Sequence, residues 1–140
     1  MNWETIFKVI TSALGGFVGY LYGGWTGLLP ILLIFMAIDQ LTGLLASYIE
    51  GKLSSRVGGK GIARKAYILF IIAVCHLVDK SFATSGMYDG QMVMDGAVLF
   101  YLVNELLSFV ENAGRIGVPL PSQLMNAVAI LKGKEKGDDK

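Results

Sequence analysis

A long uncharged stretch dominates the N-terminal third of the sequence. From Val9 to Ile38, thirty consecutive residues include no Asp, Glu, Lys or Arg, and Asp39 then interrupts an apolar segment that continues beyond it. Hydrophobic stretches of about 18 or more residues with few charges are typical of transmembrane helices. An ionisable residue inside such a span marks a candidate functional site, because a charge in hydrocarbon needs a partner or water. The sequence therefore predicts an integral membrane protein.

The overall composition agrees with this interpretation. Hydrophobic residues make up 54% of the chain and charged residues only 16%, whereas soluble domains contain about 25% charged residues. The net charge of +1 provides no overall field that would attract nucleic acid. The single cysteine, Cys75, excludes an intrachain disulfide and a cysteine-based zinc site.

Four apolar segments can be drawn along the chain, at residues 6–22, 28–49, 66–82 and 92–110. A helix needs about 20 residues to cross a bilayer, so each segment is close to the length of one span. Pro30 falls in the first turn of the second helix, where proline is tolerated. We predict an all-α membrane protein in which residues 1–118 form a domain of four transmembrane helices. The alternative is three spans, with the first segment lying on the membrane or leaving it.

Residues 119–140 form a second, cytoplasmic part in this prediction. Leu124, Val128 and Leu131 have the i, i+4, i+7 spacing of an apolar stripe, which predicts a short amphipathic helix. The mixed-charge sequence that follows Gly133 is typical of a disordered tail.

The distribution of basic residues predicts the orientation of the spans. The linker at residues 50–65 contains five bases and one acid, whereas the loop at residues 81–91 has one acid and no base. Short loops rich in Lys and Arg remain in the cytoplasm, so both termini are predicted to be cytoplasmic. The linker could also contact anionic lipid headgroups. Its basic residues are Lys52, Arg56, Lys60, Arg64 and Lys65.

Polar residues lie inside two of the predicted spans. In the second span, Asp39, Gly43, Ala46 and Glu50 share one helix face. We exclude an ionised Asp39 that faces lipid, because a central acid costs about 2.5–3.5 kcal/mol on insertion scales. The fourth span carries acids and amides on one face and a second polar edge. The candidate residues for a pore lining or an assembly surface are Asp39, Gln40, Asp95, Asn104, Glu105, Ser108 and Asn112.

Small residues recur at helical spacing in the first two spans. Glycines at every fourth position let two helix backbones approach closely in lipid. Packing within one subunit and contact between subunits are both open at this point. The candidate helix-packing residues are Gly15, Gly19, Gly23, Gly43 and Ala46.

The sequence contains no set of residues suited to catalysis, cofactor binding or metal binding. Cys75 and His76 are adjacent, so they point about 100° apart on a helix and form no dyad. We expect a structural role for His76, with Asp79 as the acid near enough to pair with it. The sequence Val-Gly-Gly-Lys-Gly at residues 57–61 lacks the Gly-Lys-Ser/Thr ending of a phosphate-binding loop. We therefore predict a protein that is not an enzyme and has no cofactor.

Several segments occur in an order that matches a known family. The sequence Ile-Asp-Gln-Leu-Thr-Gly-Leu-Leu-Ala at residues 38–46 is an acid-containing span, and a Ser-Ser and glycine-rich basic segment follows at 52–65. Asp79 ends the next span, and Asn-Glu-Leu-Leu-Ser-Phe-Val-Glu-Asn at 104–112 precedes Gly-Val-Pro-Leu-Pro at 117–121. Over about residues 33–131, this ordered set resembles the holins of the toxin-secretion and phage-lysis type.

The resemblance implies a small protein of the bacterial inner membrane that assembles with itself into lesions. These lesions would release an endolysin or a toxin, leading to host lysis or export. The next methionine after Met1 is Met36, so any antiholin would be a separate product. Acids within spans also suit a small ion channel or a membrane subunit of a transporter, which is the main alternative. A structural scaffold, with acids that only pair internally, is a third interpretation.

Overall fold

The computed structural model describes residues 2–24, 27–131 and 133, and this part of the chain is all-helical. Four helices are long and apolar enough to cross a membrane. This confirms the predicted all-α membrane fold with four candidate spans and a short C-terminal helix. The predicted disorder of the charged tail concerns residues outside the described ranges. In chain order the helices are α1 (Trp3–Tyr22), α2 (Leu29–Ile49), α3 (Ser55–Thr84), α4 (Met92–Arg115) and α5 (Ser122–Leu131).

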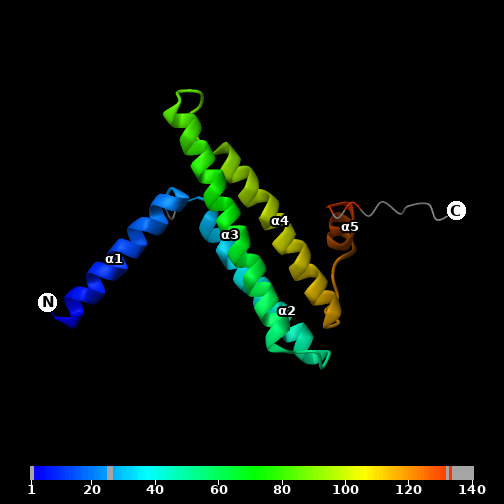
Figure 1. Cartoon of the computed structure of the whole chain (residues 1–140). Helices are drawn as coiled ribbons and strands as arrows, with labels where there is room; N and C mark the ends of the chain where they lie inside the picture. Colours follow the sequence, from blue (N-terminus) through cyan, green and yellow to red (C-terminus); the bar gives the residue numbers. More distant parts are fainter. Residues whose placement is uncertain (1, 25–26, 132, 134–140) are drawn as a thin grey trace.

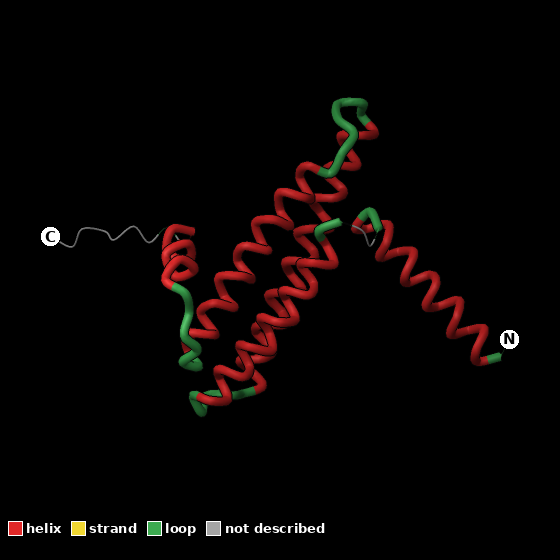
Figure 2. Tube along the Cα trace, turned by 180° about the vertical axis from the view of Figure 1, so that it is seen from behind, coloured by secondary structure: helices red, strands yellow, loops and turns green. Residues whose placement is uncertain are grey.

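Helices α2, α3 and α4 pack side by side into a three-helix bundle, from which α1 diverges (Figure 1; Figure 2). The bundle core consists of apolar side chains spaced one helical turn apart on each helix. Leu32, Ile72 and Val98 contribute one such side chain from each helix, and all three are fully buried. The loop between α2 and α3 lies at the same end of the bundle as the C-terminal end of α4 (Figure 1).

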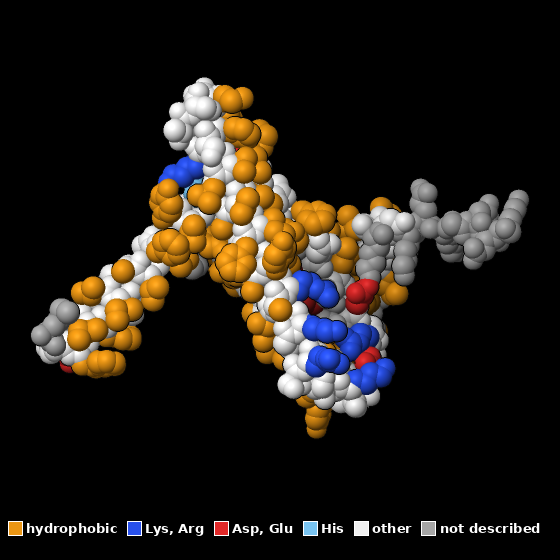
Figure 3. Space-filling model, in the orientation of Figure 1, with side chains coloured by type: hydrophobic (Ala, Val, Ile, Leu, Met, Phe, Trp, Pro, Cys, Tyr) orange, Lys and Arg blue, Asp and Glu red, His pale blue; other side chains and the backbone are white. Residues whose placement is uncertain are grey.

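The outer surface of the bundle is largely apolar. Ile34, Phe70 and Phe100 all expose more than half of their surface, and hydrophobic side chains cover much of the face shown in Figure 3. Lys and Arg side chains gather toward the end that holds the α2–α3 loop (Figure 3). An apolar belt next to a basic end is the pattern expected for helices surrounded by lipid.

Helix α3 begins earlier than the sequence predicted. The Ser54 hydroxyl accepts a hydrogen bond from the backbone N–H of Val57 at 3.2 Å, which is an N-cap. The predicted basic loop therefore ends at Ser54, and only Lys52 lies in it. The loop prediction was therefore wrong for four of its five bases. Glycines at 58, 59 and 61 lower the helix propensity of this segment, which favours a loop, but packing against α2 stabilises the helix in spite of them. The bases that lie in α3 instead are Arg56, Lys60, Arg64 and Lys65.

Asp79 is buried inside the protein, and only 1% of its surface is exposed. Its two carboxylate oxygens accept hydrogen bonds from the backbone N–H groups of Val93 at 3.1 Å and Met94 at 2.8 Å. These donors belong to the first turn of α4, where intrahelical partners are lacking. The expected pairing of Asp79 with His76 was wrong, because within the described residues no ion pair or hydrogen bond joins these two side chains, and the buried His76 Nδ1 has no hydrogen-bond partner.

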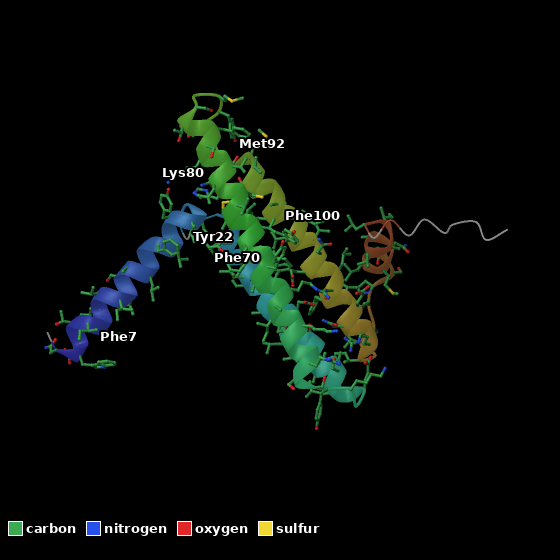
Figure 4. All side chains as sticks on the ribbon, in the orientation of Figure 1. Phe7, Tyr22, Phe70, Lys80, Met92 and Phe100 are labelled. Atoms are coloured by element: carbon green, nitrogen blue, oxygen red, sulfur yellow. The ribbon has the colours of Figure 1, made fainter. Side chains whose placement is uncertain are left out.

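Helix α1 joins the bundle through its C-terminal end. The Tyr22 hydroxyl donates a hydrogen bond to the carbonyl of Leu69 at 2.9 Å, and the Lys80 ammonium lies 3.7 Å from the centre of the Tyr20 ring. Figure 4 shows Tyr22 and Lys80 at this junction, whereas Phe7 lies far from the bundle. No residue of α1 is buried. The helix is therefore anchored at one end and exposed along the rest of its length.

Candidate functional site

Three charged side chains from three helices meet inside the bundle. The Lys65 ammonium of α3 donates hydrogen bonds to Oδ2 of Asp39 in α2, at 2.8 Å, and to the carboxylate of Glu105 in α4. The exposed fractions of the Lys65, Asp39 and Glu105 side chains are 14%, 11% and 6%. This charged cluster gives Asp39 the partner that its position inside a span requires.

Asn112 extends the charged cluster along α4. Its Nδ2 donates to Oδ1 of Asp39 at 3.0 Å, with further contacts to the Asp39 carbonyl at 3.3 Å and the Thr42 hydroxyl at 3.2 Å. Gly43 lies opposite this amide, and a Cβ added there would be 3.4 Å from Asn112 Nδ2. Ala46, one turn further along α2, is fully buried. The lack of a side chain at Gly43 therefore lets α2 and α4 approach closely at this point.

Arg115 continues the network to the end of the bundle. Its Nε and Nη2 each lie 3.0 Å from a different carboxylate oxygen of Glu50, and Nη2 also donates to the Ser47 hydroxyl at 3.2 Å. Its Nη1 donates to Oδ1 of Asn112 at 3.2 Å. This guanidinium holds the pKa of Glu50 below its usual range, mainly through the hydrogen bonds. Polar contacts thus run without a break from Glu50 to Glu105.

The charge balance of the cluster makes it most sensitive to the loss of Lys65. Two carboxylates share one ammonium, so the cluster carries an excess negative charge when all three groups are ionised. Buried charges are costly unless they are paired and hydrogen-bonded. A buried ion pair is itself weak evidence of stability, but breaking one leaves an uncompensated charge and costs about 3–5 kcal/mol.

The charged cluster forms part of the wall of a cleft with a volume of about 850 Å³, which we call the α3–α4 cleft. Its polar lining includes Gln40, Asn104 and Ser108 in addition to the cluster, and Leu131 of α5 lies at its edge. Cavities of about 300–1,000 Å³ are large enough to hold small molecules. The cleft therefore provides room for water or a ligand next to buried charges.

The structure brings together most of the polar residues predicted from the sequence, but not all of them. Asp39, Glu105 and Asn112 are in direct contact with the network, and Ser108 lines the cleft. Asp95 is exposed in the first turn of α4, near the opposite end of the bundle. An acid at that position is favourable because it faces the positive end of the helix dipole.

The small residues predicted in α1 have different environments. A Cβ added at Gly15 or Gly19 would meet nothing within 4 Å, so this face makes no close contact within the described chain. Gly23 has φ of 70° and lies against His76 and Gln91, where a Cβ would be 2.7 Å from His76 Cε1. Of the three glycines predicted for helix packing at Gly15, Gly19 and Gly23, only Gly23 therefore packs against another part of the described chain.

Sequence analysis missed Lys65 as a partner inside the bundle and Arg115 as a partner at its end. The mid-span position of Asp39 required a counter-charge, and Lys65 is the basic residue that directly precedes the third apolar segment. The pattern indicated the need for a cation, but it did not identify which one. The described residues contain no group of three or more His, Cys, Asp or Glu side chains that could hold a metal ion.

Comparison with known proteins identifies the family of this chain. Residues 16–133 match the model of the bacteriophage holin family. The chain belongs to the bacteriophage holin family. Holins are multi-pass membrane proteins, and the four long apolar helices of this chain agree with that placement.

Three relatives of this holin illustrate its distribution. An uncharacterized protein of Halalkalibacterium halodurans is 45% identical over 94% of this chain and 98% of the relative. An uncharacterized protein of Listeria monocytogenes is 38% identical, covering 97% of this chain and 94% of the relative. An uncharacterized 14.9 kDa protein encoded in the nagH 3′ region of Clostridium perfringens is 32% identical, covering 88% and 90%. No solved structure matches this holin.

Proposed function

We propose that this holin accumulates in the bacterial inner membrane with both termini in the cytoplasm, and that it assembles with itself into lesions. An endolysin or a toxin would leave the cell through them, leading to lysis or export. The observation that carries this proposal is the polar network that runs from the exposed Glu50 to the buried Glu105, because its inner part holds pore-suited polar groups inside a lipid-compatible bundle. Any inhibitor of assembly would be a separate product.

Pairing inside the bundle supports harmless accumulation of single subunits. Lys65 satisfies both Asp39 and Glu105, so an isolated subunit exposes no unpaired charge of this cluster to lipid. In an assembly, the same groups can face water in the α3–α4 cleft or polar groups of a neighbouring subunit. The polar residues that we assign to this second role are Asp39, Gln40, Asp95, Asn104, Glu105, Ser108 and Asn112.

The exposed face of α1 supports contact with a second copy. Gly15 and Gly19 lie one turn apart, and no described side chain or backbone of the same chain covers them. Small residues at this spacing allow close helix approach in lipid, where association depends on packing rather than on hydrophobic burial. We assign this face to contact between subunits.

Timed expression in a bacterial host tests the proposal. A culture that also carries a cytoplasmic reporter enzyme should release the enzyme abruptly at a fixed time after induction. Replacing Gly15 and Gly19 with Leu should delay or abolish release, because the larger side chains block close approach. Ala13→Leu adds a similar side chain on the opposite face of α1 and is the matched control. Release with unchanged timing from the double variant would contradict the role of this face.

The competing function is a small ion channel or a membrane subunit of a transporter. The α3–α4 cleft favours this second candidate, because its charged wall could hold an ion. Vesicles that contain the purified chain and trapped markers of graded size separate the two functions. Passage of folded proteins supports the holin function, and passage of ions alone supports a channel.

A further inference from the structure

A second, smaller hollow lies at the basic end of the bundle, between α2, α3 and α4. We call it the basic hollow, and its volume is about 320 Å³. Its lining includes three cations, Lys60, Arg64 and Arg115, and one acid, Asp39. Because Asp39 already pairs with Lys65, the hollow has an excess of positive charge. This charge is complementary to an anion.

Two of the three cations are available for a ligand. Arg115 uses its guanidinium on Glu50, Ser47 and Asn112. By contrast, no acid in the described part of the chain forms an ion pair with Lys60 or Arg64. These residues are four positions apart in α3, so their side chains lie on the same helix face. An ammonium and a guanidinium in this arrangement can bind the oxygens of one phosphate together.

The helix backbone between the two cations is shaped by glycine. A Cβ added at Gly61 would lie 2.5 Å from Oε1 of Gln40, so any other residue would displace the Gln40 side chain that lines the hollow. Gly58 faces Leu44, where an added Cβ would be 3.3 Å from a Leu44 methyl group. The glycines that lower the helix propensity of this segment therefore let α3 approach α2 and keep the lining residues in place.

The position of the basic hollow indicates a lipid rather than a soluble anion. Lys60 and Arg64 directly precede the apolar part of α3, so they lie at the depth of lipid headgroups. The hollow shares Gln40, Gly61 and Arg64 with the α3–α4 cleft. Apolar side chains that are not fully buried also line the cleft, among them Tyr67 and Ile71, and an acyl chain can contact them.

We propose that the basic hollow binds the phosphate of an anionic phospholipid. Lys60 and Arg64 donate hydrogen bonds to the phosphate oxygens, and the acyl chains run along the apolar wall of the α3–α4 cleft. Basic pockets between membrane helices on the cytoplasmic side are suited to lipids of this class. The proposal does not depend on pore formation, because lipid binding is measured on the purified protein without lysis.

The test compares two variants with the same change in charge. Wild-type protein in detergent is mixed with phosphatidylglycerol or phosphatidylcholine, and the retained lipid is measured by native mass spectrometry. Lys60→Gln with Arg64→Gln removes both cations of the hollow. Lys52→Gln with Arg56→Gln removes two nearby bases that line neither the hollow nor the cleft. We expect wild-type protein to retain phosphatidylglycerol selectively, and the first variant to bind it about 30-fold more weakly.

The outcomes distinguish a site from a diffuse charge effect. The control variant should bind phosphatidylglycerol within about threefold of wild type, because its bases lie outside the hollow. Equal losses in both variants would overturn the proposal in favour of diffuse attraction. Displacement of the lipid by glycerol phosphate as effectively as by phosphatidylglycerol would assign the site to a soluble phosphate. Loss of helical circular dichroism in the first variant would show that it does not fold. The exchange Lys60→Arg with Arg64→Lys then replaces it as the test, because it keeps both charges of the hollow. Failure of this exchange variant to bind phosphatidylglycerol would refute the proposal.

Discussion

Replacing Lys65 with Met removes the cation that two buried carboxylates share. The lost hydrogen bonds are those to Asp39, at 2.8 Å, and to Glu105. The Asp39 and Glu105 side chains are only 11% and 6% exposed, so without the ammonium they lose their only oppositely charged partner in the described chain. Removing one partner of a buried pair costs about 3–5 kcal/mol, and we expect this loss in the free energy of unfolding.

The same reasoning predicts recovery when all three charges are removed together. In the variant Asp39→Asn, Lys65→Met, Glu105→Gln no uncompensated charge remains, and the amide introduced in place of the Asp39 carboxylate keeps an oxygen that can accept from Asn112. Replacement of a whole buried ion cluster by neutral groups is often close to neutral. The free energy of unfolding of the triple variant should therefore be within about 2 kcal/mol of the wild-type value, although Lys65→Met alone lowers it by more than this.

The measurement is unfolding of the purified protein in mixed micelles by SDS, followed by helical circular dichroism. Arg56→Met is the matched control, because Arg56 is a cation of the same helix that pairs with no acid in the described ranges and lines neither the basic hollow nor the α3–α4 cleft. Its effect should stay within about 0.5 kcal/mol. A loss below about 1 kcal/mol for Lys65→Met, or no recovery in the triple variant, would refute the coupling of the three charges.

Three further predictions concern the ends of the helices. Arg115 lowers the pKa of Glu50, so the pair stabilises the fold above the unfolded-state pKa of Glu50, and this contribution is lost as the pH falls through the lower folded-state pKa. Arg115→Gln should therefore flatten the pH dependence of SDS unfolding in the acidic range, and an unchanged curve would exclude the pair as its source. Gly23→Ala forces a side chain into φ of 70° and against His76, so it should loosen α1 by about 1 kcal/mol or more and speed proteolysis between α1 and α2; cleavage at the wild-type rate would contradict this. Asp79→Ala removes both acceptors at the start of α4 and should cost about 1–2 kcal/mol of stability, whereas a change within error would show that other groups satisfy these N–H donors.

The sequence was sufficient to predict the helices because apolar length is a direct measure of membrane-spanning capacity. The start of α3 was not predictable in the same way. Its first turns carry glycines and bases, which by local preference indicate a loop, and the contacts that override this preference come from Gln40 and Leu44 of α2. Such contacts depend on tertiary packing, and the residue pattern of a single segment does not reveal which contacts it makes with another helix.

The polar residues of the candidate site were predictable from the sequence, but the residue that pairs with each of them was not. The position of Asp39 required a counter-charge, and the polar face of the fourth span placed Glu105 and Asn112 on one side. The choice of Lys65 as the shared cation depends on how far α3 slides along α2 and α4. Neither this axial register nor the divergence of α1 leaves a pattern in a single sequence.

The one-ended attachment of α1 leaves its N-terminal end free to move sideways relative to the bundle. A helix of 20 residues is about 30 Å long, so a tilt of about 10° at Gly23 moves its free end by about 5 Å. In the proposed assembly, two subunits can therefore meet through their α1 helices before their bundles are in contact. The distance between two bundles at this first contact is then set by the length of α1 as well as by the width of the bundle.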